Sequence, residues 1–335
     1  MAQNRRTFLK ATSAAGIGSA AALGTEAQAQ PRATGLLQPM PKGLTFCTLR
    51  GDRGTTLGIR RADGILDVAR AEAALKTGAP TTMTALLAGQ GDIAALERLA
   101  ARSDRSITRY LVKPEEAAFG PCVTDPEKII CVGLNYRAHA AEANQRPPEV
   151  PILFNKYNSS LNHHNGVINI SREHATRFDY EAELCIVMGR EARDVSEADA
   201  LSYVFGYCCG QDFSVRDLQS RTTQWMVGKA GDGWGPLGPW LVTADQVDPD
   251  NLKIEGLVNG EVRQSSNTNM LIHNCRKLIS YSSMYMTLKP GDVIFTGTPE
   301  GVIAGYPRDR QVWLKQGDRL TVRIEKLGEQ LVTLV

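Results

Sequence analysis

Short apolar runs bounded by Gly, Pro or Asn dominate the chain after residue 126, and this pattern predicts β-strands. The strands expected lie at 129–133, 183–188, 204–209, 240–243, 252–259, 292–296 and 320–324. Helical spacing is less common and predicts helices over 138–144, over 197–203 behind Ser196, and over 275–287 behind Asn274. Many strands with few helices between them disfavour a doubly wound parallel sheet and favour an α+β, β-rich fold with a rolled sheet.

Residues 35–120 show a different pattern, which predicts a small N-terminal α+β domain. Short strands are expected at 45–49, 56–59 and 65–68, and helices at 82–87 and 93–101. Two prolines and an aspartate between Pro121 and Pro126 then change the composition. We therefore place a domain boundary there, with a β-rich catalytic domain at 126–333.

The first 29 residues have the features of a targeting segment. The paired Arg5 and Arg6 precede a mildly apolar, Ala- and Gly-rich stretch at 11–24 and a small-x-small site that ends at Ala29. This resembles a twin-arginine (Tat) signal peptide cleaved after Ala29, which predicts a periplasmic or other extracytoplasmic protein. The stretch is too short and too rich in Ala and Gly to span a bilayer stably, so no stable membrane insertion is expected after processing. The alternative is a basic amphipathic helix at a cytoplasmic N-terminus.

Charge and cysteine content exclude several classes of function. Removing residues 1–29 deletes Arg5, Arg6, Lys10 and Glu26 and leaves 35 basic and 35 acidic side chains. A neutral chain without basic runs gives no support to nucleic-acid binding. The seven cysteines show no CxxC spacing, so we expect small buried side chains and neither a zinc site nor a disulfide framework.

Carboxylates are the candidate chemistry. Glu181 and Glu183 stand two apart on a predicted strand and therefore point to the same face, where a cation is expected unless that face is solvated. Asp212 follows another apolar strand and offers a third carboxylate, although Asp217 could serve equally, and Asp179 could simply cap a turn. Three carboxylates suit Mg²⁺ or Mn²⁺, with Ca²⁺ able to take the same oxygen ligands, and leave open positions for water and a chelating substrate.

Seven segments in a fixed order extend this interpretation to a family. They are Ile130 to His139, Asp179 to Leu184, Gln211 to Asp217, Gly228 to Asp232, Pro236 to Pro239, Val258 to Glu261 and Thr296 to Val302. Together they resemble the motifs of the fumarylacetoacetate hydrolase (FAH) family over about residues 126–333. The resemblance implies an FAH-type mixed β-sheet roll and a homodimer.

The resemblance also implies roles for individual residues. It places Glu181, Glu183 and Asp212 on the metal and selects Asp212 over Asp217. It makes His139 and Glu142, three apart on one helix face, a water-activating dyad on a lid. It assigns Lys229 to an enolate or a substrate carboxylate. Further substrate contacts are expected from Tyr136, Arg216, Gln219 and Thr298.

Two departures from the family pattern bear on specificity. His163 and His164 stand where related sequences more often have glycine and proline, and Cys208-Cys209 precede the metal aspartate. Adjacent strand residues point in opposite directions, so His163 and His164 are not expected to share one metal.

The predicted function is a divalent-metal-dependent hydrolase that cleaves a carbon–carbon bond in a small 2,4-dioxo acid, such as an acylpyruvate or a fumarylacetoacetate-like compound. The same site would also support decarboxylation or isomerisation of a 2-oxo acid, because each needs a metal-stabilised enolate. A non-catalytic periplasmic binding protein is the alternative from another class. The presence of His139, Glu142 and Lys229 argues against it.

Overall fold

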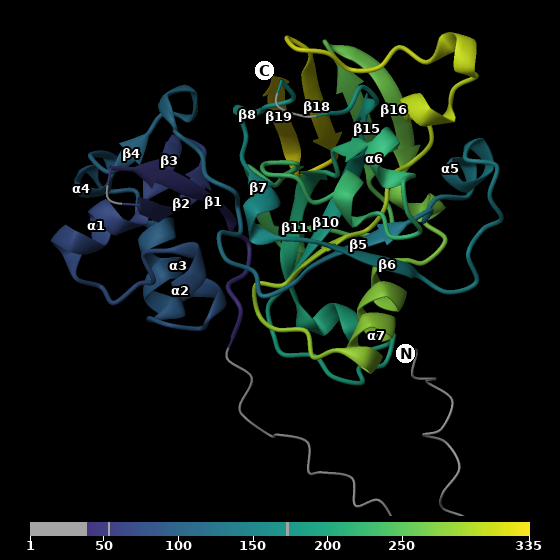
Figure 1. The fold of residues 1–335 in the computed structure, drawn as a ribbon. Coiled ribbons are helices and arrows are strands. Elements are labelled where there is room, and N and C mark those ends of the chain that lie inside the picture. The colour runs from purple at the N-terminus through teal and green to yellow at the C-terminus, as the bar shows by residue number, and fades with distance from the viewer. Residues whose placement is uncertain (1–38, 53, 172–173) are drawn as a thin grey trace, which may run out of the picture. The chain divides into compact units, whose positions relative to one another are not determined.

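The computed structural model describes residues 39–335, except 53 and 172–173, and an antiparallel pair of buried strands lies at its centre (Figure 1). These strands are β10 (Ala182–Met188) and β11 (Val204–Gln211), and every residue in both is buried. The predicted signal segment at 1–29 lies outside the described residues, and within them no helix is long and apolar enough to cross a membrane.

β10 and β11 belong to a ten-stranded sheet in the order β4-β3-β2-β1-β14-β11-β10-β17-β5-β6. The other members are β1 (Thr45–Gly51), β2 (Gly54–Arg61), β3 (Gly64–Asp67), β4 (Leu111–Val112), β5 (Ile129–Gly133), β6 (Ile152–Lys156), β14 (Leu241–Thr243) and β17 (Val293–Phe295). The β17–β5 pair is parallel, whereas the neighbouring β10–β17 pair is antiparallel. The sheet is therefore mixed.

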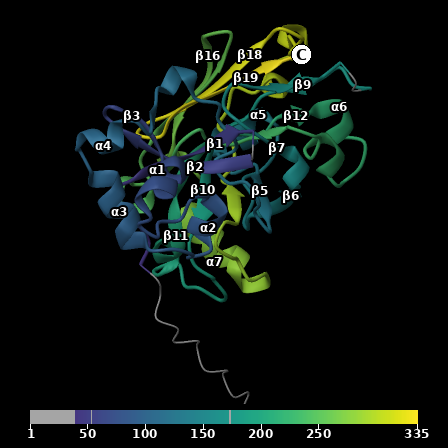
Figure 2. The same cartoon turned by 90° about the vertical axis from the view of Figure 1, so that its left-hand side faces the viewer.

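A five-stranded sheet, in the order β16-β15-β18-β19-β8, contacts β10 and β11 (Figure 1). Its strands are β8 (Gly166–Ile168), β15 (Lys253–Val258), β16 (Glu261–Asn267), β18 (Arg319–Ile324) and β19 (Gly328–Leu334). Two small pairs complete the strands, and Figure 2 shows one of them, β9 beside β12. These pairs are β9 (Phe178–Asp179) with β12 (Ser214–Val215), and β7 (Leu161–Asn162) with β13 (Gly235–Pro236). The expected β-rich α+β fold is confirmed.

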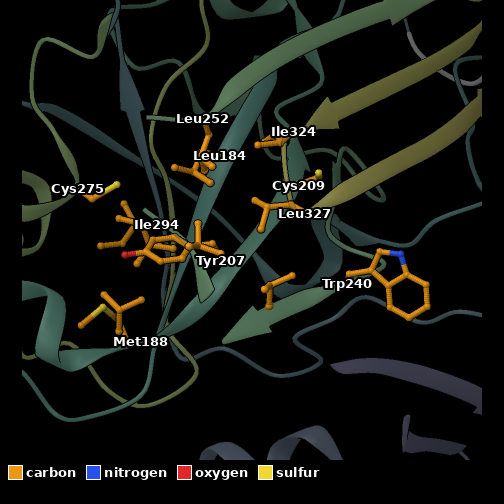
Figure 3. Close-up of a cluster of buried hydrophobic side chains, with 14 of the residues drawn as sticks. Leu184, Met188, Tyr207, Cys209, Trp240, Leu252, Cys275, Ile294, Ile324 and Leu327 are labelled. Atoms are coloured by element: carbon orange, nitrogen blue, oxygen red, sulfur yellow. The ribbon is translucent and has the colours of Figure 1, made fainter. Parts of the chain in front are cut away.

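Alternation along β10 divides the core into two clusters. Leu184 and Ile186 pack with Ile324 in one cluster, between the two sheets (Figure 3). Cys185 and Val187 point the other way, into a cluster shared with the N-terminal helices. Strand periodicity therefore places Glu183 on the same side of β10 as Cys185.

Helices are few. They are α1 (Val68–Leu75), α2 (Met83–Leu87), α3 (Ile93–Ala101), α4 (Arg105–Thr108), α5 (Arg137–Glu142), α6 (Arg216–Gln219) and α7 (Cys275–Tyr285). Short 3₁₀ turns are η1 (Pro114–Glu116), η2 (Asn158–Ser160), η3 (Ala200–Tyr203), η4 (Met226–Gly228), η5 (Ala244–Gln246), η6 (Thr268–Met270), η7 (Ile303–Gly305) and η8 (Arg308–Arg310). As predicted, Asn274 caps α7 by accepting a hydrogen bond from the amide of Lys277.

One local prediction is wrong. The helix expected at 197–203 is only the 3₁₀ turn η3, because the amides of Asp199 and Ser202 bond the carbonyls three residues earlier, although the Ser196 hydroxyl accepts from the amide of Asp199 as a cap would. The strand expected at 65–68 is confirmed as β3, which ends one residue earlier at Asp67, and the side chain of Asp67 caps the unpredicted helix α1 by accepting from the amide of Arg70.

The N-terminal strands join the strands of the β-rich part. β1 pairs with β14, with Thr45 opposite Val242 and Phe46 opposite Leu241. Strands of the segments 35–120 and 126–333 thus share one sheet, and their division into two separate domains stays a prediction.

Candidate metal and active site

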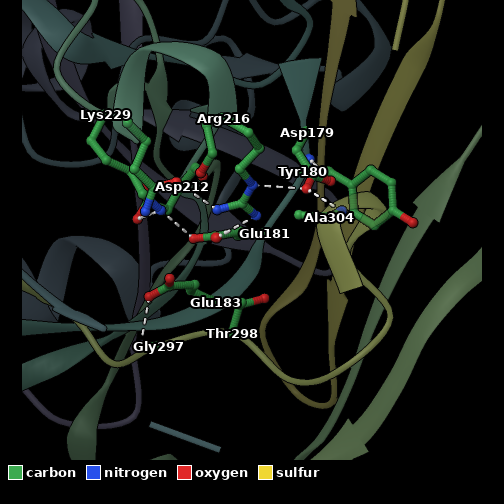
Figure 4. Close-up of polar contacts among 12 residues, drawn as sticks. Asp179, Tyr180, Glu181, Glu183, Asp212, Arg216, Lys229, Gly297, Thr298 and Ala304 are labelled. Atoms are coloured by element: carbon green, nitrogen blue, oxygen red, sulfur yellow. Dashed lines mark hydrogen bonds and ion pairs between the residues drawn. The ribbon is translucent and has the colours of Figure 1, made fainter. Parts of the chain in front are cut away.

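The carboxylate triad lies where β10 begins and β11 ends (Figure 4). Glu181 directly precedes β10, Glu183 is its second residue, and Asp212 directly follows β11. The antiparallel pairing of the two strands brings these positions together, and the amide of Asp212 donates to the carbonyl of Glu181 at 3.0 Å. One carboxylate oxygen from each residue lies within 4.8 Å of the others, and all three side chains are buried.

Two of the three carboxylates have cationic partners. Lys229 Nζ lies 2.6 Å from Glu181 Oε2 and 3.0 Å from Asp212 Oδ2. Lys156 Nζ lies 2.7 Å from Asp212 Oδ1, and Arg216 Nη2 lies 2.7 Å from Glu181 Oε1. Burial acts to raise the pKa of Glu181, but the charges of Lys229 and Arg216 outweigh it and hold this pKa below its ordinary value.

Glu183 differs from both. Among the described residues, its carboxylate accepts one hydrogen bond, from the amide of Gly297 at 2.7 Å, and it forms no ion pair. Burial, together with the charges of Asp212 and Glu181, raises the pKa of Glu183 well above its ordinary value. A hard divalent cation would neutralise this charge, and an all-carboxylate donor set suits Mg²⁺, Mn²⁺ or Ca²⁺ better than zinc. The triad therefore fits the predicted metal.

Glycines allow close approach at two points of this site. The backbone of Gly297 has φ of +102°, and a Cβ there would lie 2.7 Å from the Cβ of Asn135. A Cβ on Gly228 would collide with the backbone of Gln219. Gly297 thus allows its own amide to reach the Glu183 carboxylate. Gly228 allows the backbone directly before Lys229 to lie close to Gln219.

Lys229 is charged in this environment. Burial acts to lower its pKa, but the carboxylates of Asp212 and Glu181 raise it above the ordinary value. The ammonium group also lies 5.2 Å from the centre of the Phe154 ring. A protonated, desolvated lysine beside the triad suits an interaction with an anionic substrate group.

His139 and Glu142 form the predicted dyad on α5. His139 Nδ1 lies 2.7 Å from Glu142 Oε1, and Glu142 Oε2 accepts from the amide of Gly301 at 2.9 Å. The carboxylate therefore orients the imidazole and leaves Nε2 for other contacts. Both residues line the same cavity as Glu181 and Glu183, whereas Asp212 lies behind these two and does not line it.

The cavity has a volume of about 730 Å³ and receives most of the predicted site residues. Those that line it are His139, Glu142, Glu181, Glu183, Arg216, Gln219, Lys229 and Thr298. Tyr136 does not line it: its side chain is buried, and burial together with the charge of the nearby Glu183 raises the pKa of its hydroxyl. Its backbone forms a bridge with Leu271. The Thr298 hydroxyl already donates to the carbonyl of Ala182 at 2.9 Å, which leaves its amide for a substrate carboxylate.

The residues whose roles the sequence analysis left open lie outside the triad. Asp217 accepts a hydrogen bond from the amide of Thr176. His163 Nδ1 contacts the carbonyl of His164, and His164 Nδ1 accepts from the amide of Leu331, so the two rings have separate partners. Neither histidine lines the cavity.

A family comparison agrees with this geometry. The family described as fumarylacetoacetate (FAA) hydrolase C-terminal matches residues 128–335. The chain belongs to the fumarylacetoacetate hydrolase family. Its FAH-type fold is confirmed by the structure of fumarylacetoacetate hydrolase from Exiguobacterium antarcticum, with a TM-score of 0.72 at 30% identity over 87% of this chain and 99% of that one.

Other members of the FAH family that resemble this chain differ in reaction. The mitochondrial oxaloacetate tautomerase FAHD2A of Bos taurus is 39% identical over 282 residues, which cover 82% of this chain and 86% of that protein. The fumarylpyruvate hydrolase of Pseudomonas aeruginosa, solved with Mn²⁺ and pyruvate, has a TM-score of 0.58 at 34% identity, covering 65% of this chain and 91% of that one. Family membership therefore leaves the reaction class open.

Two residues of this FAH-family site were not predicted. Lys156, the last residue of β6, forms a buried ion pair with Asp212. Asp179 does more than cap a turn: its carboxylate accepts from the amides of Ile303 and Ala304 and from Arg216 Nε, at 2.8 to 3.0 Å (Figure 4). The only sequence signal was the position of Asp179 two residues before Glu181.

Proposed function

We propose that this chain is a divalent-metal-dependent hydrolase that cleaves a carbon–carbon bond in a small 2,4-dioxo acid. The observation that carries the proposal is one cavity lined by both the buried carboxylates and the His139–Glu142 dyad. The similar fumarylpyruvate hydrolase with Mn²⁺ and pyruvate supports it.

Glu181, Glu183 and Asp212 would hold the cation. When bound, a divalent cation polarises the oxygens of a chelating 2-oxo acid and stabilises negative charge on them. Glu183 would gain the positive partner that it lacks among the described residues. Lys229, Lys156 and Arg216 limit the excess negative charge of the triad.

The dyad would activate water. Glu142 accepts the Nδ1 proton of His139, so Nε2 can accept a proton from a water molecule that attacks the carbonyl distant from the carboxylate. The carbon–carbon bond then breaks, the acyl part leaves as a carboxylic acid, and the remainder leaves as the enolate of a 2-oxo acid such as pyruvate. Lys229 would stabilise this enolate, and a proton from the imidazolium completes the product.

Tautomerisation is the second candidate, and the similarity to the bovine oxaloacetate tautomerase favours it. This reaction needs proton transfer between carbon and oxygen of an enolisable 2-oxo acid but no attacking water. The two reactions therefore differ in their need for the dyad.

The deciding experiment incubates the purified chain with acylpyruvates and with enolised oxaloacetate, in Mg²⁺, in Mn²⁺ and in a chelator, and identifies products by NMR. Metal-dependent release of a carboxylic acid and a 2-oxo acid supports the hydrolase. Keto–enol exchange without a second acid supports the tautomerase, and release of carbon dioxide supports a decarboxylase. Metal-dependent binding of these compounds without turnover would support the binding protein.

We also infer export and dimerisation, from the Arg5-Arg6 segment and from the family resemblance, respectively. Substituting both arginines by lysine should retain the protein in the cytoplasm, as cell fractionation would show. Light scattering of the purified chain should give twice the monomer mass. A cytoplasmic wild-type protein, or a monomer, would contradict the respective inference.

A further inference from the structure

Asn135 is a fully buried polar residue with no part in the chemistry above. It lies between the end of β5 at Gly133 and the start of α5 at Arg137, and it does not line the cavity. Its Nδ2 donates to the carbonyls of Thr296 at 2.7 Å and of His273 at 2.9 Å. Its Oδ1 accepts from the amide of His273 at 2.9 Å. A buried amide with three partners fixes the segments that it joins.

The bond to Thr296 acts on the amide that holds Glu183. The carbonyl of Thr296 and the N–H of Gly297 belong to one peptide group. That N–H donates to Glu183 Oε2 at 2.7 Å (Figure 4). A hydrogen bond to the carbonyl polarises a peptide group and strengthens the bond that its N–H donates. Asn135 thus orients and strengthens the hydrogen bond to the one carboxylate of the triad that has no cationic partner in the described part of the chain.

Close packing leaves this peptide group little freedom to turn. A Cβ on Gly297 would lie 2.7 Å from the Cβ of Asn135, so the two backbones are in direct contact. On the other side, Thr296 donates both its amide and its hydroxyl to the carbonyl of Leu184, at 3.0 and 2.9 Å. The peptide group is therefore held between β10 and Asn135, with its N–H directed at Glu183.

Asn135 also ties the dyad helix to the same segment. It stands two residues before α5, and the Glu142 carboxylate at the other end of α5 accepts from the amide of Gly301 at 2.9 Å. Both ends of α5 are thus connected to the segment 296–301. Since that segment also holds Glu183, the dyad and this carboxylate share one support.

We propose that Asn135 is a positioning residue that couples Glu183 to the dyad helix α5 through the Thr296–Gly297 peptide group. A movement of Glu183 on metal binding then passes through the peptide group and Asn135 to the first turn of α5. The inference rests on the proposed metal site but not on the proposed reaction. It predicts that a change at Asn135, outside the cavity, weakens metal binding.

The chain supplies a matched control in Asn162, which is also buried. Its Nδ2 donates to two carbonyls, those of Val167 and Gly233, and its Oδ1 accepts from the amide of His163. None of these partners holds a carboxylate of the triad. Asn135→Ala and Asn162→Ala remove the same number of hydrogen bonds, so comparable losses of melting temperature are expected in a chelator.

Metal affinity separates the two variants. Calorimetry with Mn²⁺ on the full chain, at a temperature where both variants are folded, should give a Kd raised by about tenfold in Asn135→Ala and by less than about twofold in Asn162→Ala. Equal Kd values in the two variants would overturn the inference and leave the proposed function intact. Absence of Mn²⁺ binding by the wild-type protein would overturn the proposed function and this inference together.

A spectroscopic measurement tests the coupling on the wild-type protein, and so decides the inference even if Asn135→Ala does not fold. In ¹⁵N-labelled protein, addition of Mg²⁺ should shift the NMR signals of the Gly297 backbone amide and of the Asn135 side-chain amide with the same midpoint. The side-chain amide of Asn162 should stay unchanged. A shift of Gly297 alone, or of neither group while Mg²⁺ binds, would contradict the coupling.

Discussion

The two faces of β10 are equally buried but differ in the energetic effect of that burial. On the face of Leu184 and Ile186, apolar side chains pack between the sheets, which stabilises the fold by roughly 25 cal/mol per Å² of surface removed from water. On the opposite face, the charged groups of Glu181 and Glu183, together with Asp212 after β11, are removed from water, which costs free energy unless they are paired. The same periodicity thus builds a core on one face and, on the other, a site whose unpaired charge weakens the fold.

The largest expected effect comes from Glu183→Gln. It keeps the side-chain volume but removes the carboxylate that has no cationic partner in the part of the chain that the structure describes. Turnover should fall by about a thousandfold, or about 4 kcal/mol in the activation barrier. In a chelator, the melting temperature should stay the same or rise, because like-charge repulsion is relieved. Full activity, or a large loss of stability in the chelator, would contradict the comparison.

Leu184→Ala tests the opposite face of β10, at the residue next to Glu183. A buried leucine replaced by alanine should lower the free energy of unfolding by about 2 to 5 kcal/mol in a denaturant titration. Activity per folded molecule should change by less than about twofold, because Leu184 points into the cluster between the sheets. If activity at a temperature where the variant is folded falls as far as in Glu183→Gln, the two faces are not separable.

Addition of a divalent cation should remove the energetic difference between the two faces of β10. At a concentration about one hundred times its Kd, Mg²⁺ or Mn²⁺ should stabilise the wild-type protein by about 2.7 kcal/mol in thermal unfolding. The gain should vanish in Glu183→Gln and in Asp212→Asn. A gain retained in both variants would place the cation elsewhere.

The smallest effects compare two threonines that both bond β10. Thr296 donates its hydroxyl to the carbonyl of Leu184, and Thr298 to that of Ala182. Valine at either position should cost about 1 kcal/mol of stability. Only Thr298→Val should also raise KM, by about threefold, because loss of the bond to Ala182 frees the backbone whose amide faces the substrate, whereas Thr296 does not line the cavity. Equal KM values in the two variants would show that the cavity contact is unimportant.

The features that the sequence predicted depend on regular periodicity. The bounds of α3 and β5 agree with 93–101 and 129–133, and the positions of Glu181 and Glu183 follow from strand alternation. The His139–Glu142 contact follows from helical spacing. Short-range geometry of this kind is contained in a few consecutive residues.

The features that were missed depend on distant or competing contacts. Lys156 reaches Asp212 from a strand 56 positions earlier in the chain, and no local pattern marks it. The Asp179 carboxylate accepts hydrogen bonds from the backbone amides of residues more than 120 positions away. The helix expected at 197–203 is a 3₁₀ turn, because the amides of Asp199 and Ser202 bond the carbonyls three residues earlier. The export signal, the dimer and the domain division stay predictions.

The seven cysteines, all buried and free, offer a way to follow the protein's motions. Thiol reagents require contact with the sulfur in its thiolate form, and burial raises the pKa of the Cys47 and Cys275 thiols as well as shielding them. Cys47 lies in β1, Cys185 beside the triad and Cys275 in α7. The order in which peptides containing these residues acquire a label would therefore map which regions open first, with no probe introduced into the protein.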